Sequence, residues 1–137
     1  MWNVSVRRLM FGGVVALLAT IGAGSRLVGQ TPTVQRKILL QQDFEVPGYE
    51  VLLIEATLPV GGREGKHTHP GTMVGYLQEG SMDLEVEGKP TLTLKAGDSA
   101  MVEAGKVHEG INRGRVPTKA LVTFIVQKGK PLTTPRP

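Results

Sequence analysis

The sequence predicts a single all-β domain, a jelly-roll barrel made of two packed sheets. Eighteen glycines and nine prolines are spread between short apolar runs in a chain of 137 residues, a pattern typical of strands joined by many turns. Apolar and polar residues alternate with a period of two in several of these runs, as they do in half-buried strands. About eight such runs follow one another at hairpin spacing, and a double-sheet barrel protects the edges of so many short strands.

The expected strands lie between residues 34 and 128, which we take as the bounds of the barrel. In chain order they are 34–40, 49–58, a short strand around 67–69, 73–78, 82–87, 91–94, 99–102, 107–111 and 119–127. The run 82–87 is the clearest, because apolar residues alternate with acidic ones and so leave one face buried and one in water. Residues 129–137 form a proline-rich tail. We expect it to lie along the surface or to be disordered, because proline cannot donate a sheet hydrogen bond.

Residues 1–29 are expected to be a signal peptide or a membrane anchor and not part of the barrel. Arg7 and Arg8 precede an apolar stretch over 9–24, and small residues follow it, as in a secretory signal. The arginine pair also loosely resembles a twin-arginine leader. Because the stretch is shorter than the roughly 20 residues of a membrane-spanning helix, we expect a periplasmic or secreted protein. Its mature chain would begin between residues 24 and 31, and an uncleaved inner-membrane anchor is the alternative.

The charge of the chain gives no support to nucleic-acid binding. The formal net charge is +4, but residues 1–29 hold three of the 16 basic residues and no acidic one, so 13 basic residues face 12 acidic ones in the remainder. The remaining lysines and arginines are scattered and are not interleaved with aromatic residues. The chain has no cysteine, which excludes disulfides and attachment through a lipidated cysteine. A nucleic-acid partner is therefore not expected.

All three histidines of the chain lie where they can bind one metal ion. His67 and His69 form an H-x-H pair, and His108 follows in a second glycine-rich segment. Residues i and i+2 of a strand point to the same face, so His67 and His69 can hold an ion together, and His108 would complete the set. Neutral imidazole suits several transition metals. We expect one divalent ion, with iron, zinc, copper, nickel and manganese left open.

The spacing of these histidines resembles the two sequence motifs of the cupin superfamily. In the first motif Gly61 and five further residues precede the H-x-H pair, and Gly80 ends the segment. In the second, the segment 97–112 begins with a glycine, contains Gly105 and His108, and ends at Asn112. The resemblance implies a double-stranded β-helix and a metal bound by the three histidines.

Two positions depart from the family pattern. Met73 stands where the first motif has a glutamate that many cupins use as a fourth ligand, and Glu103 replaces a proline of the second motif. Met73 either fills the barrel interior as a flexible apolar side chain or acts as a thioether ligand that would favour copper(I). Asn112 either orients a ligand or holds a loop by a buried hydrogen bond. We therefore take Met73 and Asn112 as candidate pocket residues, and place Glu103 in solvent and Glu109 outside the barrel.

Function is less determined than fold, because cupins include dioxygenases, isomerases, sugar-binding modules and storage proteins. With histidines alone, the site resembles that of dioxygenase cupins, which implies a metal-dependent oxygenase-type reaction on a small oxygen-bearing molecule. The alternative is a non-catalytic module that binds or senses a small sugar or carboxylate. No general base is evident beside the histidines, and no catalytic residue can be assigned. A homodimer is left open.

Overall fold

The computed structural model describes residues 33–137. These residues contain strands and turns but no α-helix, so nothing in this range could cross a membrane as a helix. The segment expected to be a signal peptide or anchor, residues 1–29, lies outside the described residues, as does the expected start of the mature chain. The export prediction therefore stays a prediction.

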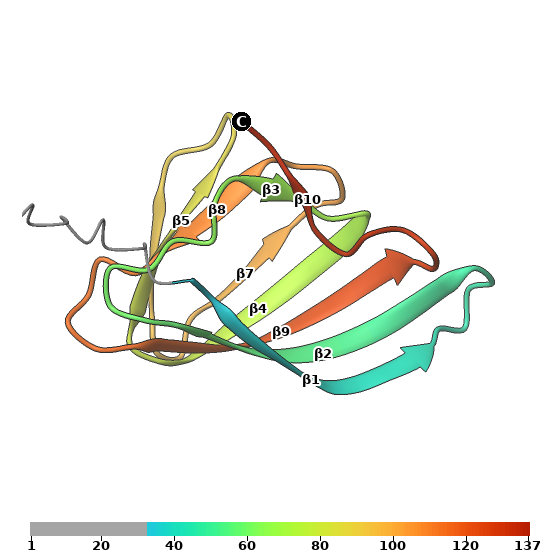
Figure 1. The fold of residues 1–137 in the computed structure, drawn as a ribbon, viewed down its shortest axis with the longest axis horizontal. Coiled ribbons are helices and arrows are strands. Elements are labelled where there is room, and N and C mark those ends of the chain that lie inside the picture. The colour runs from blue at the N-terminus through green and yellow to red at the C-terminus, as the bar shows by residue number, and fades with distance from the viewer. Residues whose placement is uncertain (1–32) are drawn as a thin grey trace, which may run out of the picture.

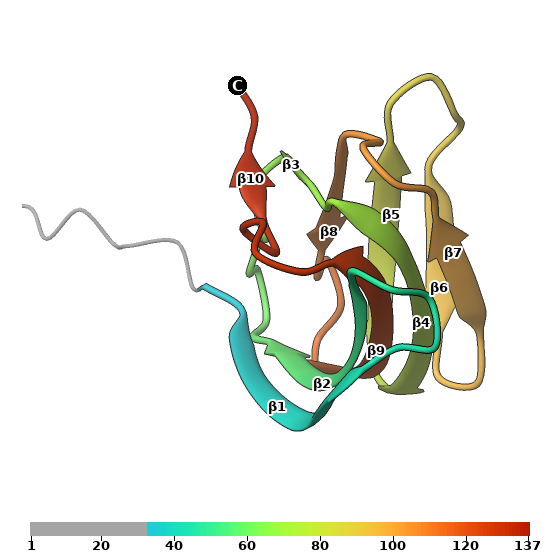
Figure 2. The same ribbon diagram turned by 90° about the vertical axis from the view of Figure 1, so that its right-hand side faces the viewer.

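The strands form two antiparallel five-stranded sheets that face each other (Figures 1 and 2). The first sheet has the order β1 (Gln35–Asp43), β2 (Tyr49–Leu58), β9 (Thr118–Gln127), β4 (Gly71–Glu79) and β7 (Ser99–Val102). The second has the order β10 (Thr134–Pro135), β3 (His67–Thr68), β8 (His108–Ile111), β5 (Ser81–Val86) and β6 (Leu92–Lys95). The all-β, two-sheet jelly-roll prediction is confirmed.

The expected strand positions agree with the structure over most of the barrel. The strands at 49–58 and 99–102 have the predicted bounds, and the others differ by one to three residues at an end. The motif glycines Gly61, Gly80, Gly97 and Gly105 have positive φ values between 72° and 96°, which residues with a Cβ rarely adopt. At Gly80 a Cβ would also lie 2.6 Å from the carbonyl oxygen of Pro117. Glycine is therefore required where β4 turns into β5.

The core lies between the sheets and follows the period-two pattern of the long strands. On β2, Leu52 and Ile54 are buried, and on β9, Phe124 and Val126 are buried against them. A second cluster at the other end of the barrel contains Leu77, Leu84, Leu94, Val102 and Ala120. Met73 packs against both clusters, so it lies in the barrel interior between them.

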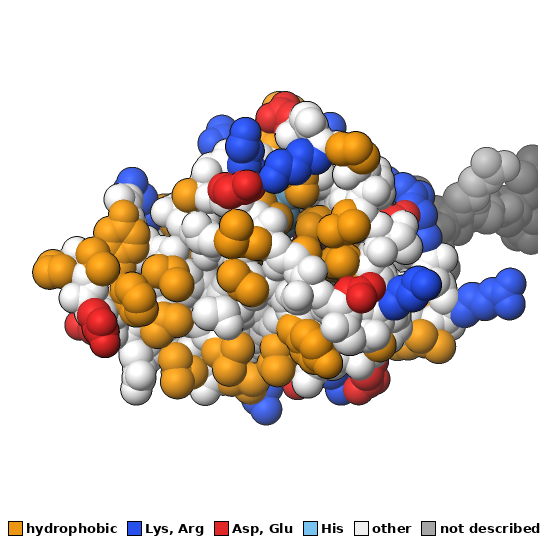
Figure 3. Space-filling model, turned by 180° about the vertical axis from the view of Figure 1, so that it is seen from behind, with side chains coloured by type: hydrophobic (Ala, Val, Ile, Leu, Met, Phe, Trp, Pro, Cys, Tyr) orange, Lys and Arg blue, Asp and Glu red, His pale blue; other side chains and the backbone are white. Residues whose placement is uncertain are grey.

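The outer face of the first sheet carries several exposed apolar side chains. Its register places Leu40, Leu53, Thr123, Val74 and Met101 in one row across the sheet, and Val74 and Met101 are 46% and 57% exposed. Seen from behind, the molecule presents many apolar side chains between its charged ones (Figure 3). Such a face is suited to contact with another molecule. The homodimer left open by the sequence stays a prediction.

The proline-rich tail differs from its prediction, because it pairs with the second sheet. Thr134 and Pro135 lie opposite Thr68 and His67 as the short strand β10, and the backbone N–H of Arg136 donates to the Lys66 carbonyl at 2.9 Å. β10 is the edge strand of its sheet, the position at which a proline is tolerated because no partner needs its missing N–H. The tail therefore runs directly beside the histidine pair.

Candidate metal centre

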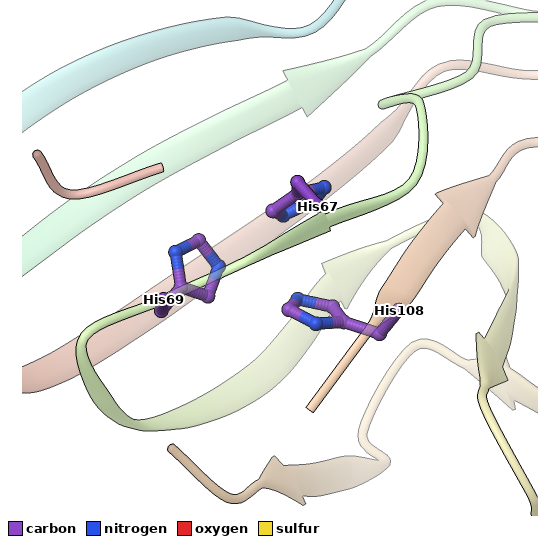
Figure 4. Close-up of side chains that lie close together, drawn as sticks. All are labelled: His67, His69 and His108. Atoms are coloured by element: carbon purple, nitrogen blue, oxygen red, sulfur yellow. The ribbon is translucent and has the colours of Figure 1, made fainter. Parts of the chain in front are cut away.

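The three histidines meet inside the barrel, on the second sheet. His67 begins β3, His69 follows it, and His108 begins β8, where it lies directly opposite His67 in the strand register. Their rings converge (Figure 4), with centroids 4.4 to 4.9 Å apart. Their potential ligand atoms all lie within 4.8 Å of one another. Two donors bound to one ion at about 2.1 Å stand at most about 4.2 Å apart, so small ring rotations would complete the set.

Each imidazole is held by a backbone carbonyl at Nδ1. His67 Nδ1 lies 2.7 Å from the Gly65 oxygen, His69 Nδ1 lies 2.6 Å from the Leu132 oxygen, and His108 Nδ1 lies 2.9 Å from the Lys106 oxygen. A carbonyl oxygen can only accept, so each Nδ1 carries the proton and donates it. The lone pair of every neutral ring is then on Nε2. A carbonyl partner of this kind is the usual way in which proteins orient a metal-binding histidine.

The environment of His69 and His108 favours the neutral form of the ring, which is the form that binds metal. All three residues are buried, at 2–5% exposure, and Phe124 packs edge-on against the His69 ring with centroids 4.8 Å apart. Burial lowers the pKa of His69 to about 4 and also lowers the pKa of His108. His108 Nε2 is buried without a hydrogen-bond partner among the described residues. An orphaned lone pair costs free energy unless something binds it, so the donor set fits a metal ion.

A cavity of about 60 Å³ opens from His67 and His69 into the barrel. A water molecule needs about 10–15 Å³ on this measure, so the cavity has room for a few water-sized groups. Most of its wall is apolar and comes from both sheets, including Ile54, Leu58, Met73, Leu84 and Phe124. The wall also contains two charged side chains, Arg36 and Glu64. The site therefore joins a mostly apolar space to a small charged region.

The structure separates the two candidate pocket residues. Met73 lines the same cavity as His67 and His69. Asn112 is fully buried and does not line the cavity. Its amide N–H groups donate to the carbonyls of Leu58 and Val116 at 3.0 and 2.9 Å, and its amide oxygen accepts from the Gly114 N–H. All its polar atoms are thus occupied in holding the loop after β8, so of the two roles considered for Asn112 it fills the structural one.

The two glutamates of the second motif behave differently. Glu103 is exposed and pairs with Lys89 at 3.1 Å, as expected for a solvated residue. Glu109 points away from His108 as predicted, but it is buried, and Arg63 covers it with a two-pronged ion pair at 2.7 and 2.9 Å. Glu109 also accepts the Gly65 N–H at 3.1 Å. Since the carbonyl of Gly65 holds His67, Glu109 anchors the residue whose carbonyl orients a candidate ligand.

Sequence reasoning missed three contributors to the site, namely Arg36, Glu64 and the carbonyl of Leu132. Glu64 lies in the variable stretch between Gly61 and His67, where the motif specifies no residue type. Arg36 reaches the cavity only because β1 pairs with β2, and Leu132 only because the tail pairs with β3. Strand alternation, applied to 34–40, could have placed Arg36 on the inner face. No sequence signal pointed to Leu132.

Comparison with known proteins agrees with this architecture. A family model described as a cupin domain matches residues 54–124, while a search of curated proteins finds no significant relative. A double-stranded β-helix protein from Klebsiella pneumoniae has a TM-score of 0.59 at 20% identity over 74% of this chain and 83% of its own. A cupin-like protein from Thermotoga maritima has a TM-score of 0.61 at 20% identity over 75% of both chains. The DMSP lyase DddQ from Ruegeria pomeroyi has a TM-score of 0.63 at 19% identity over 74% of this chain and 51% of its own.

Proposed function

This chain belongs to the cupin family, and from that premise we propose that it binds one divalent transition-metal ion through Nε2 of His67, His69 and His108. The observation that carries the proposal is the common orientation of the rings. Every Nδ1 is engaged by a carbonyl, and the buried Nε2 of His108 has no partner among the described residues. Three neutral donors leave positions open for a ligand, as in metal sites that act on substrates.

We propose further that the site uses this ion on a small oxygen-bearing molecule, in an oxygenase-type reaction. When bound, the ion would supply Lewis-acid or redox chemistry. The protein would supply the surroundings: Phe124 and the carbonyl of Leu132 fix the His69 ring, and the apolar wall keeps bulk water out. The alternative is a module that binds a small carboxylate or sugar without turnover. A mostly apolar cavity wall that contains Arg36 favours a small carboxylate over a sugar, which presents hydroxyl groups on every side.

The metal assignment is tested by measuring bound metal in purified protein. Substituting alanine for His67, His69 or His108 should reduce bound metal sharply, because two histidines leave the ion with too few protein donors. Met73→Leu is the matched control, since residue 73 lines the same cavity and leucine keeps its size. We expect this variant to retain metal. If all three alanine variants keep the metal content of the original protein, the assignment is wrong, and a loss of copper in Met73→Leu would make the thioether a ligand.

Turnover is tested separately from binding. Metal-loaded protein is mixed with small dicarbonyls and carboxylates while oxygen uptake and product formation are followed. Oxygen consumption by the original protein that is lost in His108→Ala would support the oxygenase proposal. Calorimetric binding of a carboxylate without any product supports the binding module instead.

We also propose that the protein is exported, because residues 1–29 combine a basic start, an apolar stretch and small residues. N-terminal sequencing of the native protein should find a start between residues 24 and 31. A chain that begins at Met1 and sediments with membranes would instead identify an anchor.

A further inference from the structure

The cavity beside the histidines has one charged corner in an otherwise apolar wall. Arg36 of β1 and Glu64 of the loop before β3 both line it, and Arg36 Nη2 lies 3.3 Å from Glu64 Oε1. The Arg36 side chain is 36% exposed and the Glu64 side chain 18%. The pair lies in the wall of the cavity that also contains His67 and His69, so a ligand bound there can contact it.

The position of Arg36 follows from the strand register. Arg36 lies opposite Ala56 of β2, and Ala56 also lines the cavity, so this pair of positions faces inward. The next residue, Lys37, lies opposite Glu55 and faces the other side of the sheet, since neighbouring residues of a strand point to opposite faces. The chain therefore places two cations side by side in sequence, one facing the cavity and one facing away from it.

The Glu64 carboxylate is held by the backbone of β8 and in turn holds the Arg36 side chain. Its Oε2 accepts the backbone N–H of Gly110 at 3.1 Å, and Gly110 lies two residues after His108 on β8. The carboxylate thus connects β8 to β1 across the mouth of the site. An arginine carries five N–H donors, and among the described residues the Arg36 side chain donates only to Glu64. The other donors are available to a ligand.

We propose that Arg36 is a ligand-anchoring residue, which binds the carboxylate of a small amphipathic acid whose apolar part lies against Ile54, Leu58 and Phe124. A guanidinium matches a carboxylate with two parallel hydrogen bonds, and the apolar wall accepts an aliphatic or aromatic body. The inference deepens the proposed function, because it rests on the metal site and names the substrate class. It makes Arg36, and not the metal alone, the source of preference for acids over neutral molecules.

The test uses calorimetry with hexanoate and its neutral counterpart hexanamide. Zn²⁺ is titrated first into the original protein and into the variants Arg36→Met and Lys37→Met, so that each is saturated with metal before the ligand is added. Hexanoate should then bind Arg36→Met about tenfold or more weakly than the original protein, because a charge-assisted hydrogen bond is lost. Hexanamide affinity should change little. Lys37→Met removes the same charge from the outer face and should leave both affinities unchanged.

Equal hexanoate affinity in Arg36→Met and the original protein would overturn the inference. A decrease in hexanoate affinity in Lys37→Met as large as that in Arg36→Met would also overturn it, because it would show only a general effect of charge. Failure of Zn²⁺ to bind would instead overturn the metal assignment. Hexanoate titration of the metal-free proteins would then still test Arg36, and a loss confined to the Arg36 variant would support its role. Arg36→Gln provides the same comparison if the methionine variant has a lowered melting temperature.

Discussion

His69 Nδ1 donates a hydrogen bond to the carbonyl oxygen of Leu132 at 2.6 Å, across 63 positions of sequence. This contact joins the C-terminal tail to a candidate metal ligand. Leu132 also packs against the core cluster of Leu52, Ile54 and Phe124, and β10 follows it along β3. The tail therefore sets the orientation and the tautomer of the His69 ring.

A chain that ends at Lys130 should bind metal about 10–100-fold more weakly, the usual effect of losing a partner that orients a ligand. The matched control ends at Pro135, which keeps Leu132 and β10 but removes Arg136 and Pro137. Its metal affinity should stay close to that of the full chain. Titration calorimetry compares the two, and equal affinities would show that the Leu132 carbonyl does not position His69.

Met73→Glu should tighten metal binding and weaken the binding of anionic ligands. Met73 lines the cavity with His67 and His69, so a carboxylate there adds a donor and a negative charge. At about 4 Å, unit charges interact by about 4 kcal/mol at an effective dielectric near 20. Met73→Gln is the uncharged control of equal size. If metal affinity is the same in both variants, residue 73 does not face the ion.

The metal-free protein should lose stability as the pH falls from about 6.5 towards about 4. An unfolded histidine has a pKa of about 6.5, whereas the pKa of His69 in the folded protein is about 4 and that of His108 is also lowered. Between these values the unfolded state binds more protons, so protonation favours unfolding. Above about pH 6.5 this contribution is constant.

Urea denaturation in the presence of a chelator measures this dependence. His69→Asn removes the titrating group and should show a shallower decline in the free energy of unfolding over the same pH interval. A flat profile in the original protein between about pH 6.5 and about 4.5 would contradict the prediction.

Arg63→Met should lower the free energy of unfolding by about 1–3 kcal/mol, because it leaves a buried carboxylate without its partner. The Glu109 side chain is only 4% exposed. Arg113 pairs with Asp83 and Glu85 at the surface, where its side chain is 59% exposed, so Arg113→Met should cost less than about 1 kcal/mol. Chemical denaturation of both variants gives the comparison.

The double variant Arg63→Met/Glu109→Met separates pairing from packing. It should recover much of the stability lost in Arg63→Met, because no buried charge remains unpaired. No recovery would mean that the loss comes from the arginine stem and not from the ion pair.

The sequence alone determined the barrel, most of its strands and the three histidines. Strand alternation is local, since a period of two can be read from residues such as Met82, Leu84 and Val86 without knowing what they pack against. The H-x-H pair is local in the same sense, because His67 and His69 are two residues apart.

Only the tertiary structure decided what surrounds those histidines. Three further residues reach the site from separate segments of the chain: Arg36, Glu64 and Leu132. Each is held there by a hydrogen bond to a residue at least 28 positions away. Glu109 had the expected direction, but its burial depends on Arg63, 46 positions away. The tail was expected to stay unpaired because of its prolines, yet an edge position beside β3 accepts Pro135. Contacts between residues distant in the chain produce no local sequence pattern. They form only when the sheets assemble, so the sequence alone does not predict them.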